Sequence, residues 1–216
     1  RYDAAGRVTA IGTSTFEYGA AGSPAAGRVT TMTDEAGKTV YAYDGMGRLT
    51  RKEQTSGPAP RRFVTAYTYG TEGSAAGHVT SMTYPSGNRI DVTYDSNGRS
   101  SALSLTRPGV ARTMILSQIS YQPFGAVRSW LWGNHSASSP NKYERQFDLE
   151  NRIVSYPIGN VKAGGATRTL TYDAAGRIVA ATHAGNAMSS RLDQRYSYDG
   201  RDRLIGFTSV TASQRF

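Results

Sequence analysis

Residues capable of acid–base or metal chemistry are few in this chain and widely spaced. The three histidines, His78, His135 and His183, lack the short ligand spacing of a metal site, and there is no cysteine. We therefore expect the histidines to be surface residues, and we predict no metal and no cofactor. The serines lack the context of a nucleophile elbow, and Gly164-Gly165-Ala166 is not followed by the Lys-Ser/Thr of a phosphate-binding loop. The sequence therefore predicts no catalytic residue.

Two tryptophans form the one arrangement that suggests ligand binding. Trp130 and Trp132 are two residues apart, which places both side chains on the same face of a strand. Aromatic rings arranged in this way either pack between strands or stack on a sugar. We expect inter-strand packing, with carbohydrate stacking as the alternative.

A repeated seven-residue pattern accounts for most of the remaining polar residues. Tyr-Asp-x-x-Gly-Arg followed by an aliphatic residue occurs at 43–49 and recurs at 2–8 and 172–178, while 94–99 has Ser100 in the aliphatic position. Degenerate copies begin at Phe147 and Tyr198, and variants with altered or longer loops begin at Tyr121, Tyr18 and Tyr69. The predicted structural turn residues are Tyr2, Asp3, Gly6, Arg7, Tyr43, Asp44, Gly47, Arg48, Tyr94, Asp95, Gly98, Arg99, Phe147, Asp148, Asn151, Arg152, Tyr172, Asp173, Gly176, Arg177, Tyr198, Asp199, Asp202 and Arg203.

The residue types of the pattern predict a tight β-hairpin turn. Asp can cap a turn with its own side chain, and Gly accepts the positive φ that follows a type I turn. Asn151 and Asp202, which replace Gly, are the residues that next best tolerate this conformation. A three-residue loop at 45–47 places Tyr43 opposite Leu49 and Asp44 opposite Arg48, so we expect a Tyr–aliphatic pair on one face and an Asp–Arg pair on the other.

The period of the pattern predicts the fold. From Tyr18 onward, the aromatic first residue of each unit (the anchor) stands at 18, 43, 69, 94, 121, 147, 172 and 198. No long window has the 3.6-residue apolar period of a helix, and single hairpins are marginal in water. We therefore predict an all-β fold of tandem antiparallel hairpins in a curled, spiralling sheet. It is one continuous repeat region over 1–216, of about nine units of roughly 25 residues, without an internal domain boundary.

The charge distribution does not favour a nucleic-acid partner. The formal net charge is +9, but the arginines recur at a fixed slot of each repeat instead of clustering in one patch or arm. No apolar run reaches the roughly 18 residues needed to span a membrane. We expect the arginines to be structural and predict neither nucleic-acid binding nor a membrane span.

The repeated motif resembles that of RHS/YD-repeat proteins, which include bacterial polymorphic toxins, the B–C component of Tc toxins and animal teneurins. The resemblance extends from Tyr2 to Leu204, and the segments 120–125 and 130–134 are more similar to bacterial members. It implies a hollow shell of hairpins that encloses a C-terminal toxin domain, in a secreted or cell-surface bacterial protein. The self-cleaving core of the family contains an Asp-Pro motif, which this chain lacks.

The resemblance leads to a structural rather than an enzymatic prediction. The expected partners are the remainder of the same polypeptide, including further repeats and the toxin cargo, together with secretion-system components. A cell-surface adhesion or carbohydrate-binding repeat module is the alternative, and Trp130 and Trp132 are its candidate residues.

Overall fold

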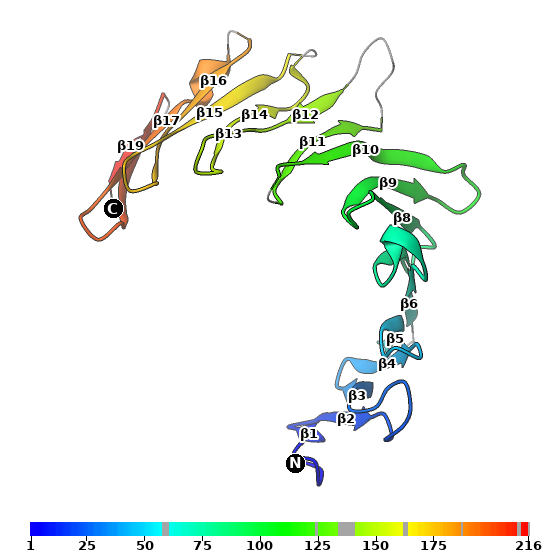
Figure 1. The fold of residues 1–216 in the computed structure, drawn as a ribbon. Helices are drawn as coiled ribbons and strands as arrows, with labels where there is room; N and C mark the ends of the chain where they lie inside the picture. Colours follow the sequence, from blue (N-terminus) through cyan, green and yellow to red (C-terminus); the bar gives the residue numbers. More distant parts are fainter. Residues whose placement is uncertain are drawn as a thin grey trace. The chain divides into compact units, whose positions relative to one another are not determined.

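A computed structural model describes residues 1–57, 61–123, 125–133, 141–161, 164–186, 188–210 and 213–215 of the chain (Figure 1). The described regular structure consists of β-strands and one-turn 3-10 helices. The all-β prediction is therefore confirmed. Within the described ranges, no helix is long and apolar enough to cross a membrane.

The backbone divides into two compact units, residues 1–115 and 116–216. Motif turns occur in both units, and the single continuous region over 1–216 stays a prediction. The first unit contains β1 (Ala10–Ile11), β2 (Ser14–Tyr18), β3 (Val29–Asp34), β4 (Gly37–Tyr43), β5 (Leu49–Ser56), β6 (Arg61–Tyr69), the 3-10 helix η1 (Gly73–Ala75), β7 (Val79–Thr83), β8 (Arg89–Tyr94), β9 (Ser100–Thr106) and the start of β10 (Thr113–Tyr121).

The second unit continues from β10 with the same hairpin organisation. It contains β11 (Val127–Trp132), β12 (Lys142–Glu144), β13 (Gln146–Phe147), β14 (Ile153–Ile158), β15 (Ala166–Tyr172), β16 (Ile178–Ala184), the 3-10 helix η3 (Ser189–Leu192), β17 (Gln194–Tyr198), β18 (Leu204–Ser209) and β19 (Ser213–Arg215). Here β10 to β12 are neighbours in one sheet and β13 to β19 in another.

Strand order follows the chain within each sheet, and neighbouring strands in the described residues pair antiparallel (Figure 1). The strands are rich in Thr, Val, Ile and Tyr, whose branched or aromatic side chains suit a pleated, half-buried surface. Tyr43 pairs with Leu49, Tyr172 with Ile178 and Tyr198 with Leu204, as the three-residue loop predicts. A one-residue bulge accompanies each of these pairs and directs the strand into the turn.

Few side chains in the described residues are deeply buried. The buried hydrophobic residues are Leu131, Ala166, Ala180 and Ala181, and Ser104 as a whole residue is 1 % exposed. Most strand residues are half-buried. Hydrophobic packing beneath the sheets is therefore limited, and contacts between neighbouring hairpins must supply much of the order.

Candidate functional site: the joints between repeats

Each motif turn is held by its Asp. In the turn at 44–48, Oδ1 of Asp44 accepts hydrogen bonds from the backbone N–H groups of Met46 and Arg48, and Oδ2 accepts one from Nε of Arg48 at 2.7 Å. The amide of Gly47 donates to the Asp44 carbonyl. The Asp–Arg part of this arrangement recurs at Asp3–Arg7, Asp95–Arg99, Asp148–Arg152, Asp173–Arg177 and Asp199–Arg203.

The residue at the Gly position of the motif has a left-handed backbone conformation in these turns. Gly47 has φ +73°, and the substitutes Asn151 and Asp202 have φ +62° and +63°. The explanation of the substitutions by backbone conformation is therefore confirmed. At the Asp202 turn, the carboxylate also accepts a hydrogen bond of 2.6 Å from Nη1 of Arg177, which belongs to the preceding repeat.

The turn contacts also affect ionisation. The backbone N–H of Arg48, followed by its guanidinium and the Met46 N–H, lowers the pKa of Asp44 despite its partial desolvation. The Asp therefore remains a charged hydrogen-bond acceptor. Burial raises the pKa of Tyr43, which keeps that phenol protonated and able to donate.

The anchor tyrosines connect one repeat to the one before it. The hydroxyl of Tyr43 donates to the backbone carbonyl of Val29 at 2.7 Å, and Val29 is the aliphatic residue of the preceding turn. Equivalent bonds of 2.6–2.9 Å join Tyr18 to Val8, Tyr69 to Leu49, Tyr94 to Val79, Tyr172 to Ile153 and Tyr198 to Ile178. These bonds were not predicted. The repeated choice of Tyr over Phe at the anchor position could have indicated them, because a half-buried hydroxyl usually has a hydrogen-bond partner.

The motif arginines make the second connection between repeats. The guanidinium of Arg48 lies over the ring of Tyr69, 4.4 Å from its centroid, and Arg7, Arg28, Arg152 and Arg177 lie over Tyr18, Tyr43, Tyr172 and Tyr198. We call each pair of contacts, the hydroxyl–carbonyl bond and the cation–ring stack, a joint. The Asp–Arg pair was predicted to lie on the face opposite the tyrosines. Instead, the guanidinium bonded to its own Asp also reaches the next aromatic ring.

The prediction that the histidines lie at the surface can be tested for His78 and His183. His135 lies outside the described residues. His78 is exposed as predicted, and its ring lies 4.9 Å from that of Tyr94, where other repeats place Arg on Tyr. The surface prediction for His183 is wrong, because its side chain is fully buried. Its Nε2 accepts from Nε of Arg168 at 2.8 Å, and its Nδ1 lies 3.1 Å from Oδ1 of Asp193.

The His183 contacts form a structural network across strands. Arg168 also donates to the hydroxyl of Tyr156, and Tyr156, Arg168 and His183 lie directly opposite one another on β14, β15 and β16. Since Arg can only donate, these partners select the tautomer with its proton on Nδ1. Both ring nitrogens of His183 are thereby occupied. Across the described residues, no group of three or more His, Cys, Asp or Glu could hold a metal ion.

The two tryptophans lie together, and Trp130 is packed against a neighbouring strand. Its ring stacks on Tyr143 of β12 with centroids 4.1 Å apart and an interplanar angle of 14°. Trp132 meets Trp130 edge-on at 5.7 Å and is 39 % exposed. Packing explains Trp130, whereas part of Trp132 remains accessible. The residues Phe124 and Asn134, which contributed to the bacterial resemblance, lie outside the described residues.

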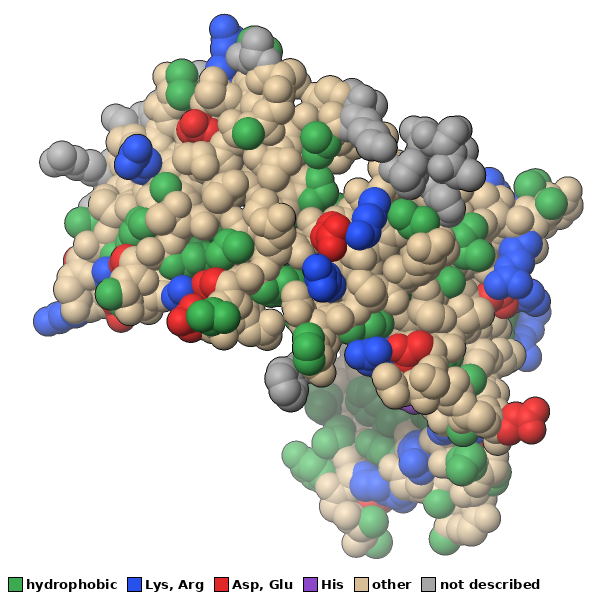
Figure 2. Space-filling model, turned by 45° about the horizontal axis from the view of Figure 1, so that its top comes forward, with side chains coloured by type: hydrophobic (Ala, Val, Ile, Leu, Met, Phe, Trp, Pro, Cys, Tyr) green, Lys and Arg blue, Asp and Glu red, His purple; other side chains and the backbone are tan. Residues whose placement is uncertain are grey.

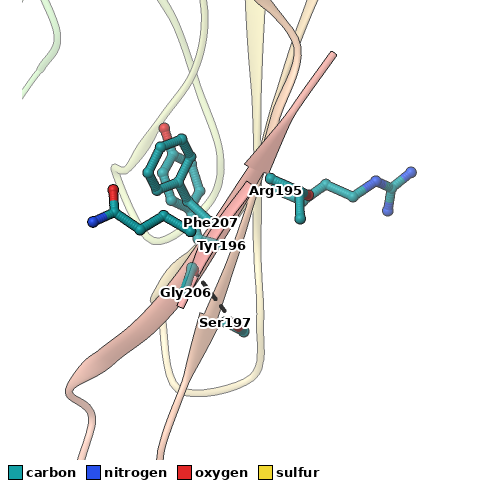
Figure 3. A pocket seen from close by; sticks show the side chains of 7 residues that line it. Arg195, Tyr196, Ser197, Gly206 and Phe207 are labelled. Carbon is teal, nitrogen blue, oxygen red and sulfur yellow. Dashed lines mark hydrogen bonds between the residues drawn. The ribbon is translucent and has the colours of Figure 1, made fainter. Parts of the chain in front are cut away.

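Charged side chains do not form one large patch on the face of the described residues that Figure 2 shows. Over the face shown in Figure 2, Lys and Arg side chains are scattered, and several lie beside Asp or Glu. A hollow of about 280 Å³ lies over β17, β18 and β19, where Gly206 has no side chain (Figure 3). Tyr196 and Phe207 project on one side of these strands and Arg195 on the other. Gly206 pairs with Ser197 next to the pair of Tyr196 and Phe207, and the lining of the hollow includes no carboxylate or histidine.

The repeat is also matched by a family model. Residues 24–59, which include the turn at 44–48 and the joint from Tyr43 to Val29, match the model described as RHS Repeat. The RHS resemblance is therefore confirmed. No sequence among the curated proteins matches the chain.

Solved RHS-like structures have the same fold as the chain. The crystal structure of TcdB2-TccC3 without its hypervariable C-terminal region superposes with a TM-score of 0.77 at 17 % identity, over 91 % of this chain and 10 % of that one. The Photorhabdus luminescens Tc holotoxin pore with a TccC3 mutation gives 0.77 at 16 % identity, over 91 % and 10 %. The crystal structure of TcdB2-TccC3 gives 0.76 at 17 %, over 91 % and 11 %. The chain thus has the RHS hairpin fold and spans about a tenth of these chains.

Proposed function

We propose that the chain is a segment of the wall of a secreted bacterial shell, which encloses a C-terminal toxin domain of the same polypeptide until delivery. In this role the chain acts by containment and catalyses no reaction. Its partners are the rest of its own polypeptide, comprising further repeats and the toxin cargo, together with components of a secretion system. The protein acts outside the bacterial cell or at its surface.

The joints are the observation that carries this proposal. Each joint ties a hairpin to the preceding one through a main-chain carbonyl and a stacked guanidinium, independently of any ligand. The Asp and Arg of each motif turn bond to each other, and Arg177 also donates to Asp202 of the next repeat. A sheet extended in this way is suited to forming a barrier.

The solved structures provide the second support. The chain has the fold of a segment of TcdB2-TccC3, and one of those crystal structures is described as lacking a hypervariable C-terminal region. A wall of constant repeats followed by a variable region is the organisation expected of a carrier with interchangeable cargo. Since the chain spans 10 % of the matched chain, the wall would be completed by repeats elsewhere in the polypeptide.

Protease protection of the downstream region tests containment. In the full-length protein, we expect the region after the repeats to resist a protease that degrades the same region expressed alone. Electron microscopy should show a closed, hollow particle. Rapid cleavage of the downstream region in an intact particle, or a particle with no cavity, would refute the containment role.

A second candidate function is glycan binding at Trp132. It is favoured by the 39 % exposure of Trp132 and its edge-on contact with Trp130, which leave part of an aromatic surface accessible. A glycan array probed with the full-length protein and its Trp132→Ala variant tests it directly. Binding lost in the variant would support a carbohydrate-binding module, and no binding to any glycan would assign both tryptophans to packing.

A further inference from the structure

The segment from Lys142 to Phe147 departs from the strand pairing seen elsewhere. The strands β2, β4, β6, β8, β15 and β17, each of which leads into an anchor, contain residues paired on both sides. For example, Ala66 pairs with Arg51 and Thr83, and Arg195 pairs with Ala180 and Thr208. In contrast, β12 pairs with β11, and β13 pairs with β14. No residue of 142–147, all of which are described, pairs on both sides in this way. Two-sided pairing is therefore interrupted at Arg145, although its backbone N–H still donates to the Arg128 carbonyl of β11 at 2.8 Å.

The chemistry of the joint is missing at the same place. Ala126 occupies the position of the motif Arg, and Phe147 occupies that of the anchor Tyr. The junction between these two successive repeats therefore lacks both the motif guanidinium that would stack on the next ring and the anchor hydroxyl that would bond to the preceding carbonyl. The carbonyl concerned is that of Val127, which pairs with Tyr121 as other aliphatic residues pair with their anchors.

Arg145 makes a substitute contact. Its Nη1 donates to the Val127 carbonyl at 3.5 Å, compared with 2.6–2.9 Å for the tyrosine joints. Its guanidinium lies 5.4 Å from the centroid of Trp130 and 5.5 Å from that of Tyr143, so it covers the stacked aromatic pair. The long bond is the weaker one, since N–H···O bonds are normally 2.7–3.2 Å. It also leaves the ring of Phe147 outside the contact.

We propose that Arg145, where the chain passes from β12 of one sheet to β13 of the other, is a seam, the position at which the second unit opens first. Local opening is easiest where few hydrogen bonds and packing contacts must be lost. Three features coincide here: the interrupted ladder, the absent hydroxyl and the absent guanidinium. Lys142 and Glu144, which form an ion pair at 2.7 Å, lie on the strand that opening would expose. Charged residues on exposed edges discourage mispairing. This proposal goes beyond containment and requires no cargo.

Hydrogen exchange in the full-length protein measures the opening. We expect the amides of Gln146 and Phe147 to exchange at least about tenfold faster than those of Thr171 and Tyr172, which precede a turn with a complete joint. This ratio corresponds to about 1.4 kcal/mol in opening free energy. Equal exchange at the two sites would overturn the proposal.

Reciprocal substitutions test whether fast exchange at 146–147 is caused by the missing joint or by the shortness of β13, which has two residues where β15 has seven. Ala126→Arg with Phe147→Tyr introduces both parts of a joint and should slow exchange at 146–147 towards that at 171–172. Arg152→Ala with Tyr172→Phe removes both parts from a complete joint and should speed exchange at 171–172. Unchanged exchange at Tyr196 and Phe207 would show that each variant is folded. If the first variant is folded and 146–147 still exchanges as fast as in the parent, the proposal is wrong. Neither readout depends on whether the shell holds a toxin.

Discussion

The hydroxyl of Tyr172 donates to the backbone carbonyl of Ile153 across 2.8 Å, and the guanidinium of Arg152 lies over the same tyrosine ring. Tyr172 and Ile153 belong to successive repeats. One aromatic side chain therefore pairs with Ile178 in its own hairpin and holds the preceding hairpin in place. Deleting its hydroxyl removes the link between hairpins while the ring stays available for packing.

Tyr172→Phe should lower the free energy of unfolding by about 1 kcal/mol, the usual net contribution of one hydrogen bond. Urea unfolding monitored by tryptophan fluorescence provides the measurement. The matched control is Tyr84→Phe, because Tyr84 is not an anchor and is 40 % exposed. The joint would be unimportant for stability if both variants unfolded like the parent.

Arg48 and Tyr69 should show energetic coupling. Their stacking distance of 4.4 Å predicts a coupling free energy of about 0.5–1 kcal/mol in a double-mutant cycle of Arg48→Met and Tyr69→Leu. The cycle cancels the loss of the Arg48–Asp44 ion pair, which both variants containing Arg48→Met share. A second cycle pairing Arg48→Met with Tyr84→Leu should give no coupling, and coupling of equal size in both cycles would argue against a specific stack.

Gly6 and Gly47 allow the cost of backbone strain at positive φ to be distinguished from the cost of a clash between a new Cβ and a neighbouring side chain. Both have positive φ, +75° and +73°, so Ala at either position should cost about 1 kcal/mol in backbone strain. A Cβ at Gly6 would meet no atom within 4 Å, whereas one at Gly47 would lie 2.7 Å from Cζ of Arg28. Gly47→Ala should therefore be the more destabilising, since Arg28 must move away from Tyr43. Thermal unfolding of the two variants tests this order. Equal losses of stability in the two variants would contradict it.

Acid should weaken the motif turns. Hydrogen bonding by the Arg48 backbone and side chain lowers the pKa of Asp44 below its unfolded-state value of about 3.9. A lowered pKa means that the carboxylate stabilises the fold above that value, and that its contribution is lost as pH falls through the folded-state pKa. Urea unfolding at a series of pH values should show stability falling chiefly below about pH 4. Asp44→Asn should reduce this dependence, and the same acid profile in that variant would point to other groups.

The sequence contained enough information to predict the local geometry of the hairpins. Asp44, Gly47 and Arg48 lie within five residues of one another, so turn chemistry alone specifies their contacts. The pairing of Tyr43 with Leu49 follows from the loop length, and the observed register confirms it. These predictions required no knowledge of any other hairpin.

The contacts between hairpins could not be derived in the same way. The acceptor for Tyr69 is the carbonyl of Leu49, and its position depends on how β5, β6 and β7 pair. His183 was wrongly predicted to be a surface residue because it stands in a stretch rich in Ala and Gly, whereas β16 extends past it and buries it between Arg168 and Asp193. In both cases, the partner comes from another strand and has no fixed spacing in the sequence.

The tyrosine hydroxyl can donate to any residue whose main-chain carbonyl lies in the correct place. Val, Leu and Ile all supply it in this chain, because the side chain of that residue takes no part in the bond. The coupling is therefore generic, and any repeat with an anchor Tyr can follow any repeat with a bulged return strand. Whole repeats could be duplicated, deleted or exchanged during evolution without redesigning their neighbours, so the length of such a protein can change in steps of one hairpin.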